Sequence, residues 1–335
     1  MASGRGFPRR RTSAQTGAKS LLGKLSKAWP RPELAEAGGD QLEHSLFNAR
    51  YYETYYFASA IRNILHDQFA YIRRLDDFYG DDKYLSLVSP FRKYSAFHCF
   101  IEFVIDDLFL ESIDEKELQR RQDECRHFGS MAKTLQELKP WVLPIEEALD
   151  QHGLSYTPYG EWLKPRNISF EQSSFDDVYE YYNDLRTEGS FEELLLQAVR
   201  ETFFVLFQNR HLLLLFNEMI SRQLENLDIE DLRHEERALF TAPGVLRRQH
   251  VPKWAETAVF YRDRGMCVLC HRDLSGMLSV GSKTHYDHMV PLAQGGLNDV
   301  TNLQLLCQDC NLQKASRDSL TSTLYEEWYP MADVE

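Results

Sequence analysis

The sequence lacks an uninterrupted apolar run of the length that a membrane-spanning helix needs, and no secretory signal segment is visible. Its most apolar stretch, residues 203–220, is broken by Gln, Asn, Arg, His and Glu side chains, which are costly inside a bilayer. Internal repeats are also absent. We therefore expect a soluble, cytoplasmic protein with no membrane partner.

Positive charge is scarce as well. The net charge of −13 argues against a generally basic protein that coats nucleic acid. The charges are uneven, with eight Lys/Arg against one acid in residues 1–33, 23 against 39 in residues 34–250, and 7 against 11 in residues 251–335. We expect residues 1–40 to be a disordered basic tail. A solvated tail, an arm that tethers DNA through phosphates, and an organelle transit peptide are its alternative interpretations.

The 335 residues are 43% hydrophobic, which is enough for a packed core and suggests a two-domain globular protein. Residues 41–240 are acidic overall and carry apolar residues at three- and four-residue steps, which is typical of helices. The predicted fold class is therefore mainly α, with a helical domain over residues 41–240. We expect this domain to act as a regulatory sensor or as an oligomerisation domain that binds a regulatory protein or a second copy.

Four segments of that region give the clearest helical patterns. In the longest, Ser190 is placed to cap the N-terminus, with Glu193 at the spacing of a capping box. Arg210 and His211, in the middle of the same segment, need partners, and we expect a satisfied pair in the core. The four predicted helices are Leu46–Phe69, Tyr94–Leu110, Leu118–Leu138 and Ser190–Leu227.

Cysteine is also sparse, but four of the six cysteines form two C-x-x-C pairs separated by 36 residues. Each pair presents two thiolates to one side, and four thiolates in a tetrahedron select a soft or borderline ion such as Zn²⁺. A site with four cysteines has no open position, so we predict a structural zinc site that closes a small domain. Its ligands are Cys267, Cys270, Cys307 and Cys310, while Cys99 and Cys125 are expected to be buried apolar residues.

A second group of polar residues lies between the two cysteine pairs. Apolar residues surround Asp287-His288 and predict a short strand, and Gly295-Gly296 predicts a turn. Residues 302–306 form a second apolar run, and residues 308–316 have helix-forming composition. We therefore predict a strand, loop, strand and helix in residues 253–335, which a linker at 241–252 joins to the helical domain.

This stretch resembles the HNH endonuclease family, whose core is a ββα-metal finger. The resemblance covers about a quarter of the chain and says nothing about residues 1–240, for which no family is recognised. Asn311 stands at the last His or Asn position of the family pattern. The residues that carry the resemblance are Cys267, Cys270, Asp287-His288, Pro291, Gly295-Gly296, Asn302-Leu303, Leu306-Cys307, Cys310-Asn311 and Lys314.

The residue types indicate the chemistry. Asp287 and Asn311 offer hard oxygen donors suited to Mg²⁺ or Mn²⁺, and two protein ligands leave room for waters and a phosphate. His288 follows Asp287 directly in a strand, so its side chain diverges and can reach an attacking water as a general base.

Three further residues complete the predicted site. The resemblance implies that Asn302 holds the loop and the orientation of the histidine through backbone contacts. Lys314 lies one turn beyond Asn311 and is expected to contact a substrate phosphate. His285 lies on the strand face of Asp287, and a further metal ligand, a substrate-side residue and a structural histidine are its alternatives.

The predicted function is a metal-dependent DNA endonuclease that hydrolyses phosphodiester bonds, with zinc as structural cofactor and Mg²⁺ or Mn²⁺ as catalytic cofactor. It could serve as a defence or restriction effector controlled by the helical domain. The alternative is a catalytically silent, zinc-stabilised module that binds DNA or protein.

Overall fold

The computed structural model describes residues 39–80, 84–128, 139–225, 227, 230, 232, 234–277, 283–315 and 318–323. The chain divides into two units, Met1–His44 and Ser45–Glu335, and all contacts below lie within the second unit. The basic tail predicted for residues 1–40 lies outside the described residues, except for the first two residues of α2.

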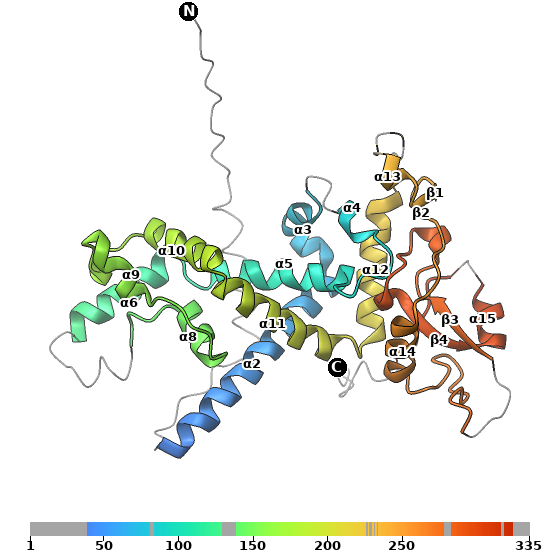
Figure 1. The fold of residues 1–335 in the computed structure, drawn as a ribbon, viewed down its shortest axis with the longest axis horizontal. Coiled ribbons are helices and arrows are strands. Elements are labelled where there is room, and N and C mark those ends of the chain that lie inside the picture. Colours follow the sequence, from blue (N-terminus) through green and yellow to red (C-terminus); the bar gives the residue numbers. More distant parts are fainter. Residues whose placement is uncertain are drawn as a thin grey trace, which may run out of the picture. The chain divides into compact units, whose positions relative to one another are not determined.

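The described part of the chain is mainly helical with two small antiparallel sheets, so the predicted fold class is confirmed (Figure 1). The helical region contains α2 (Gly39–His66), α3 (Ile72–Tyr79), α4 (Tyr84–Leu87), α5 (Ala96–Glu111), α6 (Glu115–Phe128), α8 (Pro144–Gln151), α9 (Tyr159–Leu163), α10 (Phe175–Glu188), α11 (Ser190–Leu206), α12 (Arg210–Glu225) and α13 (His234–Arg237). The C-terminal region contains β1 (Phe240–Ala242), β2 (Val245–Leu246), α14 (Lys253–Arg262), β3 (Thr284–His288), β4 (Leu303–Cys307) and α15 (Gln308–Lys314), with short 3₁₀ turns at residues 292–294 and 300–302.

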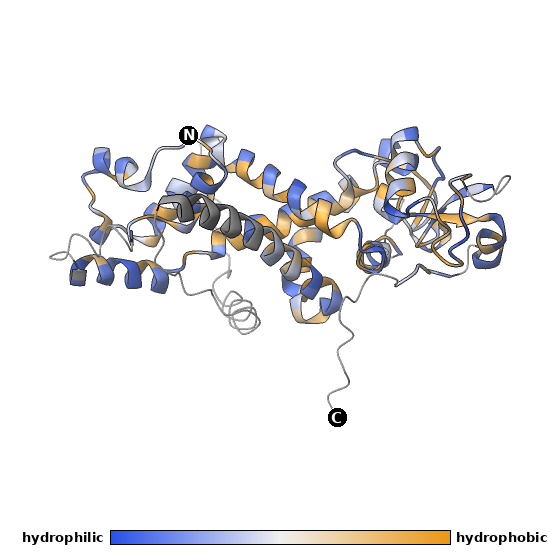
Figure 2. Cartoon of the chain, turned by 90° about the horizontal axis from the view of Figure 1, so that it is seen from below, coloured by the Kyte–Doolittle hydropathy of each residue, from blue (hydrophilic) through white to orange (hydrophobic). Residues whose placement is uncertain are grey.

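The helical region packs around α5 and α11. Hydrophobic residues gather on the inward sides of the helices, while hydrophilic residues mark their outer sides (Figure 2). Phe97 of α5 is fully buried, and its ring lies 4.9 Å from that of Phe216 in α12. Among the described helices, none combines the length and the apolar composition that crossing a membrane requires.

The single helix predicted over residues 190–227 is wrong, because the structure contains two helices there. α11 ends at Leu206 and α12 begins at Arg210. The cause is Asn209, whose side-chain oxygen accepts a hydrogen bond from the backbone N–H of Leu212 at 3.0 Å. Asparagine favours such a capping position because its amide satisfies a backbone donor that has no partner within the helix.

The predicted cap at Ser190 is also wrong. Gly189 stands at the boundary with a φ of 92°, where it ends α10 and precedes α11. Glycine adopts this left-handed conformation without the steric cost that a side chain imposes. Ser190 lies inside α11, and its hydroxyl donates to the carbonyl of Leu185.

The C-terminal region has a second hydrophobic core, built by α14, the cysteine segments and β4. β4 is buried along its whole length, so neither face of this strand is open to solvent. The fully buried members of this core are Ala255, Val259, Cys267, Leu303, Leu305 and Leu306.

Buried polar contacts join the helical region to the C-terminal region. Arg210, which is expected to have a partner in the core, lies 3.4 Å from the carboxylate of Asp263, the residue that follows α14. Asp263 also accepts two hydrogen bonds from Arg262 and one, at 2.9 Å, from the backbone N–H of Leu305 in β4. A single carboxylate therefore binds two guanidinium groups and one strand backbone.

Replacing Asp263 with Asn should destabilise the protein by about 3–5 kcal/mol, because it removes the buried negative charge that Arg262 and Arg210 both contact. The measurement is denaturant unfolding in buffer containing zinc. The control is Asp123→Asn, which disrupts an exposed ion pair on α6 and should cost less than about 1 kcal/mol. Equal effects of the two substitutions would contradict the importance of the buried carboxylate.

The unfolding free energy should fall in mildly acidic solution because His98 is buried as a neutral base. Its Nδ1 accepts the backbone N–H of Ser95 at the start of α5, and burial, followed by the charge of Arg200, lowers the His98 pKa from 6.5 to about 4. The unfolded chain then binds more protons than the folded chain, so stability is full above pH 6.5 and is lost as pH falls towards 4. At about 1.4 kcal/mol per pH unit, this loss is at most about 3 kcal/mol.

The variant His98→Asn should remove part of this slope, since an amide oxygen can accept the Ser95 N–H without titrating. The measurement is unfolding free energy against pH, and His127→Asn on the exposed face of α6 is the control. An unchanged slope in the His98 variant would refute the assignment.

Candidate metal centre and active site

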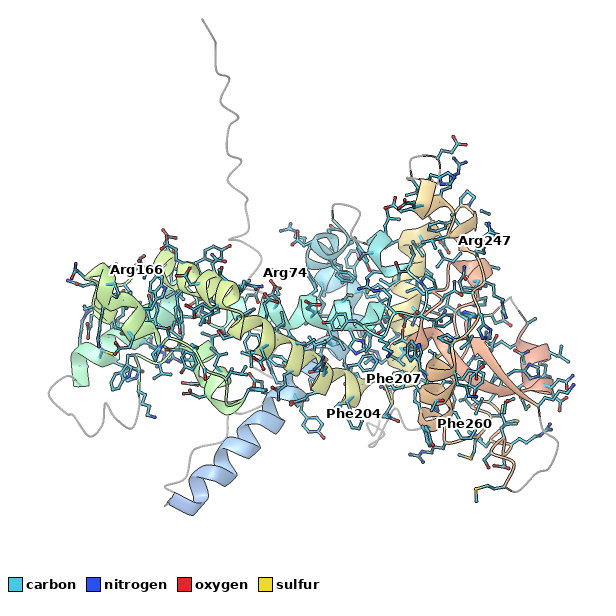
Figure 3. The ribbon with its side chains drawn as sticks, in the orientation of Figure 1. Arg74, Arg166, Phe204, Phe207, Arg247 and Phe260 are labelled. Carbon is cyan, nitrogen blue, oxygen red and sulfur yellow. The ribbon has the colours of Figure 1, made fainter. Side chains whose placement is uncertain are left out.

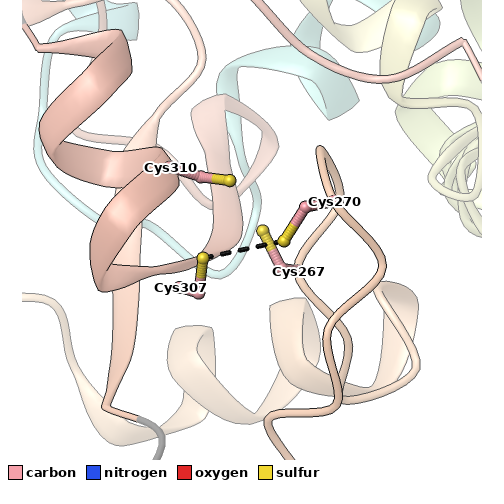
Figure 4. Close-up of side chains that lie close together, drawn as sticks. All are labelled: Cys267, Cys270, Cys307 and Cys310. Carbon is pink, nitrogen blue, oxygen red and sulfur yellow. Dashed lines mark hydrogen bonds between the residues drawn. The ribbon is translucent and has the colours of Figure 1, made fainter.

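The four cysteines of the two C-x-x-C pairs come together at one point (Figure 4). Cys267 and Cys270 lie on the turn after α14, Cys307 ends β4, and Cys310 lies in α15. All four Sγ atoms lie within 4.8 Å of one another, and those of Cys270 and Cys307 are 3.7 Å apart. All six cysteines are free, so the pairs are not disulfide-bonded.

The cluster fits a tetrahedral zinc ion. Zinc–sulfur bonds of about 2.3 Å in a tetrahedron place the sulfur atoms about 3.8 Å apart, which agrees with the observed separation. The backbone prepares this arrangement: His271 has a φ of 59° and closes the first turn through its N–H to the Cys267 carbonyl. The N–H of Val268 donates to Leu305 of β4, so the cysteine turn is already joined to the sheet.

β3, β4 and α15 form a ββα unit beside the cysteine cluster. The strands are antiparallel, and Asp287 pairs with Gln304 while His288 pairs with Leu303. Consecutive residues of a strand point to opposite faces, so the Asp287 and His288 side chains leave β3 on different sides.

Lys314 fixes both residues of this pair. Its Nζ lies 2.9 Å from Oδ2 of Asp287 and donates to the carbonyl oxygen of His288 at 2.8 Å. Lys314 is only 3% exposed, so the structure places it in an ion pair inside the fold. Its predicted contact with substrate phosphate stays a prediction.

Asp287 keeps one oxygen available. Gln304 also lies against Oδ2, at 3.4 Å, whereas no hydrogen bond or ion pair to Oδ1 occurs among the described residues. Asn311 is half-buried on α15, three residues before Lys314, and therefore lies on the side of that helix that faces β3. An oxygen of each residue can serve a hard cation.

His288 is 2% exposed, and neither ring nitrogen makes a hydrogen bond of normal geometry within the described residues. Burial, followed by the positive charges of Arg248 and Lys314, lowers its pKa to about 4, while Asn298 partly opposes this change. The imidazole is therefore neutral at pH 7, which is the form that accepts a proton.

Asn302 closes the loop between the two strands. Its Oδ1 accepts the N–H of Val290 at 2.8 Å, and its Nδ2 donates to the carbonyls of Val290 and Leu297. Gly296 lies so close that an added Cβ would stand 2.0 Å from the Val290 oxygen, so only glycine fits there. The Asn302 amide thus holds the chain directly after His288.

His285 lies on β3, half-buried, with its Nε2 shielded from solvent and without a hydrogen-bond partner among the described residues. Sequence reasoning missed Gln304, Asn298 and Asp299, which are all buried. A polar Gln304 inside the apolar run of β4 was a visible signal. The other two lie in a loop whose sequence carries no comparable pattern.

The fold and the geometry define a class: a ββα unit joined to a four-cysteine cluster of the kind that binds zinc. In agreement, residues 267–317 match the family model described as HNH endonuclease, and the predicted resemblance is confirmed for that region. The helical region remains unassigned. Comparisons with curated proteins and with solved structures gave no match.

The variant Cys307→Ser should reduce the zinc content from about one ion per chain and unfold the ββα unit, because a structural zinc supplies much of the folding free energy of such a small domain. Elemental analysis and thermal unfolding measure the two effects. Cys125→Ser, which alters an isolated buried cysteine, should leave the zinc content unchanged. Native protein that contains no zinc would contradict the assignment of the cluster.

Proposed function

We propose that this protein is a metal-dependent DNA endonuclease that hydrolyses phosphodiester bonds at Asp287, His288 and Asn311. The observation that carries the proposal is the joint position of these residues in a ββα unit that matches the HNH endonuclease family. The proposed nuclease domain covers residues 253–335, with a linker at 241–252 and a helical regulatory domain at 41–240.

Asp287 and Asn311 are the proposed ligands of the catalytic metal, through the open Asp287 Oδ1 and the side-chain oxygen of Asn311. When bound there, Mg²⁺ or Mn²⁺ supplies Lewis-acid stabilisation to the scissile phosphate and the leaving oxygen. Lys314 and Gln304 orient the Asp287 carboxylate from its other oxygen. This orientation supports the proposal because a ligand that is already fixed needs little rearrangement on binding.

His288 is the proposed general base. Its neutral imidazole accepts the proton of the water that attacks phosphorus, and the P–O bond to the leaving oxygen breaks in the same reaction. Asn302 is a positioning residue, because its side chain holds Val290 and so fixes the chain that follows His288. For His285 we favour a structural or substrate-side role over metal binding.

Two observations favour the alternative function, a catalytically silent zinc-stabilised module that binds DNA or protein. The imidazole of His288 is buried and the Asp287 carboxylate is paired with Lys314. An active enzyme must expose the imidazole to a water and a phosphate. We interpret the buried form as a resting state of the nuclease.

Control by the helical region is the second part of the proposal. Asp299, in the loop between β3 and β4, accepts the backbone N–H of Ala96 at the start of α5 at 3.0 Å. The Asn217 amide of α12 lies 3.4 Å from the Thr301 hydroxyl in the same loop. A regulatory protein or a second copy that moves α5 or α12 would therefore act on the catalytic loop, as a defence or restriction effector requires.

The test is cleavage of supercoiled plasmid in Mg²⁺. His288→Ala and the bulkier His288→Asn should both reduce the rate by about 10²–10⁴, the usual contribution of a positioned base, and added metal should not restore it. Asn311→Ala should weaken metal binding, so that higher Mg²⁺ restores part of the activity.

The control for this experiment is His127→Asn, outside the matched region, which should cut like the wild type. Zinc content and the unfolding midpoint establish that each variant is folded. His288 variants that cut as fast as the wild type would remove the proposed mechanism. A wild-type protein that binds DNA but never cuts it, with or without partner proteins, would favour the binding module.

A further inference from the structure

A short basic segment after β2 is fastened to the catalytic loop by one side chain. The Nδ2 of Asn298 donates to the carbonyl of Arg247 at 3.0 Å, and its Oδ1 accepts the N–H of Gln249 at 3.2 Å. The Asn298 side-chain amide thus forms hydrogen bonds with the backbone on both sides of Arg248. Such a pair of bonds fixes the place from which the Arg248 side chain departs.

Asn298 is itself fixed beside the proposed base. It is 4% exposed, its carbonyl accepts the N–H of Phe91 from the helical region at 2.8 Å, and it lies in the loop between β3, which ends at His288, and β4. The segment around Arg248 is therefore held against the loop that follows His288, by a buried residue that also contacts the helical region.

Arg248 is exposed, and its guanidinium has no hydrogen bond or ion pair among the described residues. Its neighbours in the site are engaged. The Arg247 guanidinium donates to the carbonyl of Ala238 at 3.3 Å (Arg247 is labelled in Figure 3). Lys314 is paired with Asp287. Arg248 is thus a cation with all its donors available.

We propose that Arg248 binds a phosphate of the nucleic-acid strand next to the scissile bond. A guanidinium presents two parallel N–H donors that match the oxygens of a phosphodiester. A contact of this kind would also offset the excess of acids over bases in residues 251–335, which opposes binding of a polyanion. The inference rests on the proposed nuclease function and assigns its substrate contact to a residue outside the matched region.

The experiment measures the binding of a fluorescent DNA duplex without added divalent metal at several salt concentrations, and plasmid cleavage in Mg²⁺. Arg248→Ala should weaken binding roughly tenfold and reduce the slope of log affinity against log salt by about 0.9, the value for one lost phosphate contact on duplex DNA. Arg248→Lys should keep the slope, because the charge remains, but bind less tightly than the wild type.

The control is Lys116→Ala, which removes one exposed positive charge from α6 and should leave affinity and slope unchanged. Introduced into the wild-type protein, Asn298→Ala should lower the slope of log affinity against log salt. Introduced into the Arg248→Ala variant, it should leave that slope unchanged, because Asn298 acts through Arg248. This non-additivity separates positioning from a general loss of stability.

The outcomes distinguish this inference from the proposed function. If the wild type cuts DNA and Arg248→Ala binds and cuts as the wild type does, the inference is overturned and the nuclease stands. If the wild type never cuts but binds DNA with a salt slope that depends on Arg248, the phosphate contact is supported and the nuclease fails. A wild type that neither binds nor cuts DNA overturns both.

Discussion

The buried carboxylate of Asp263 is the contact on which the arrangement of the C-terminal region depends. It neutralises Arg262 at the end of α14, reaches Arg210 at the start of α12, and accepts the backbone N–H of Leu305 in β4. Because these groups are shielded from water, each would be costly if left alone. The carboxylate therefore fixes where β4 begins its approach to the cysteine cluster, and so where β3, which pairs with β4, presents Asp287 and His288.

The ββα unit could be predicted in detail because its chemistry is local. The two C-x-x-C pairs require a common ion, and the apolar runs around Asp287 and before Cys307 have strand character. β4 and α15 lie within two residues of the predicted ranges 302–306 and 308–316, and β3 contains Asp287 and His288 as expected. The partners of these residues could not be predicted. Lys314 has the same spacing whether it faces solvent or Asp287, and only the packing of α15 on β3 decides in favour of burial.

In the helical region, the local sequence pattern predicts the helix boundaries less well. The apolar periodicity of residues 190–227 continues across a real break, because both α11 and α12 bury apolar residues on similar spacings. The residue that separates them, Asn209, caps α12 with its own side chain, but an asparagine inside an apolar periodic run does not by itself announce a helix boundary. Arg210, the first residue of α12, forms an ion pair with Asp263, more than fifty residues later, and no local pattern reveals this partner.

The resulting site is held by the fold on more than one side. Lys314 binds Asp287 and the His288 backbone, Asn302 binds the chain that follows, and Asn298 joins the loop to the Arg248 segment. The same loop accepts the N–H of Ala96 and contacts Asn217, so the first turn of α5 and the middle of α12 both help to hold the loop in place. Because packed elements shift between discrete arrangements rather than deform gradually, a displacement of α5 or α12 would move the loop that follows His288, and Asn298 with it. Exposure of the base and placement of the substrate-binding arginine would then be a single structural event.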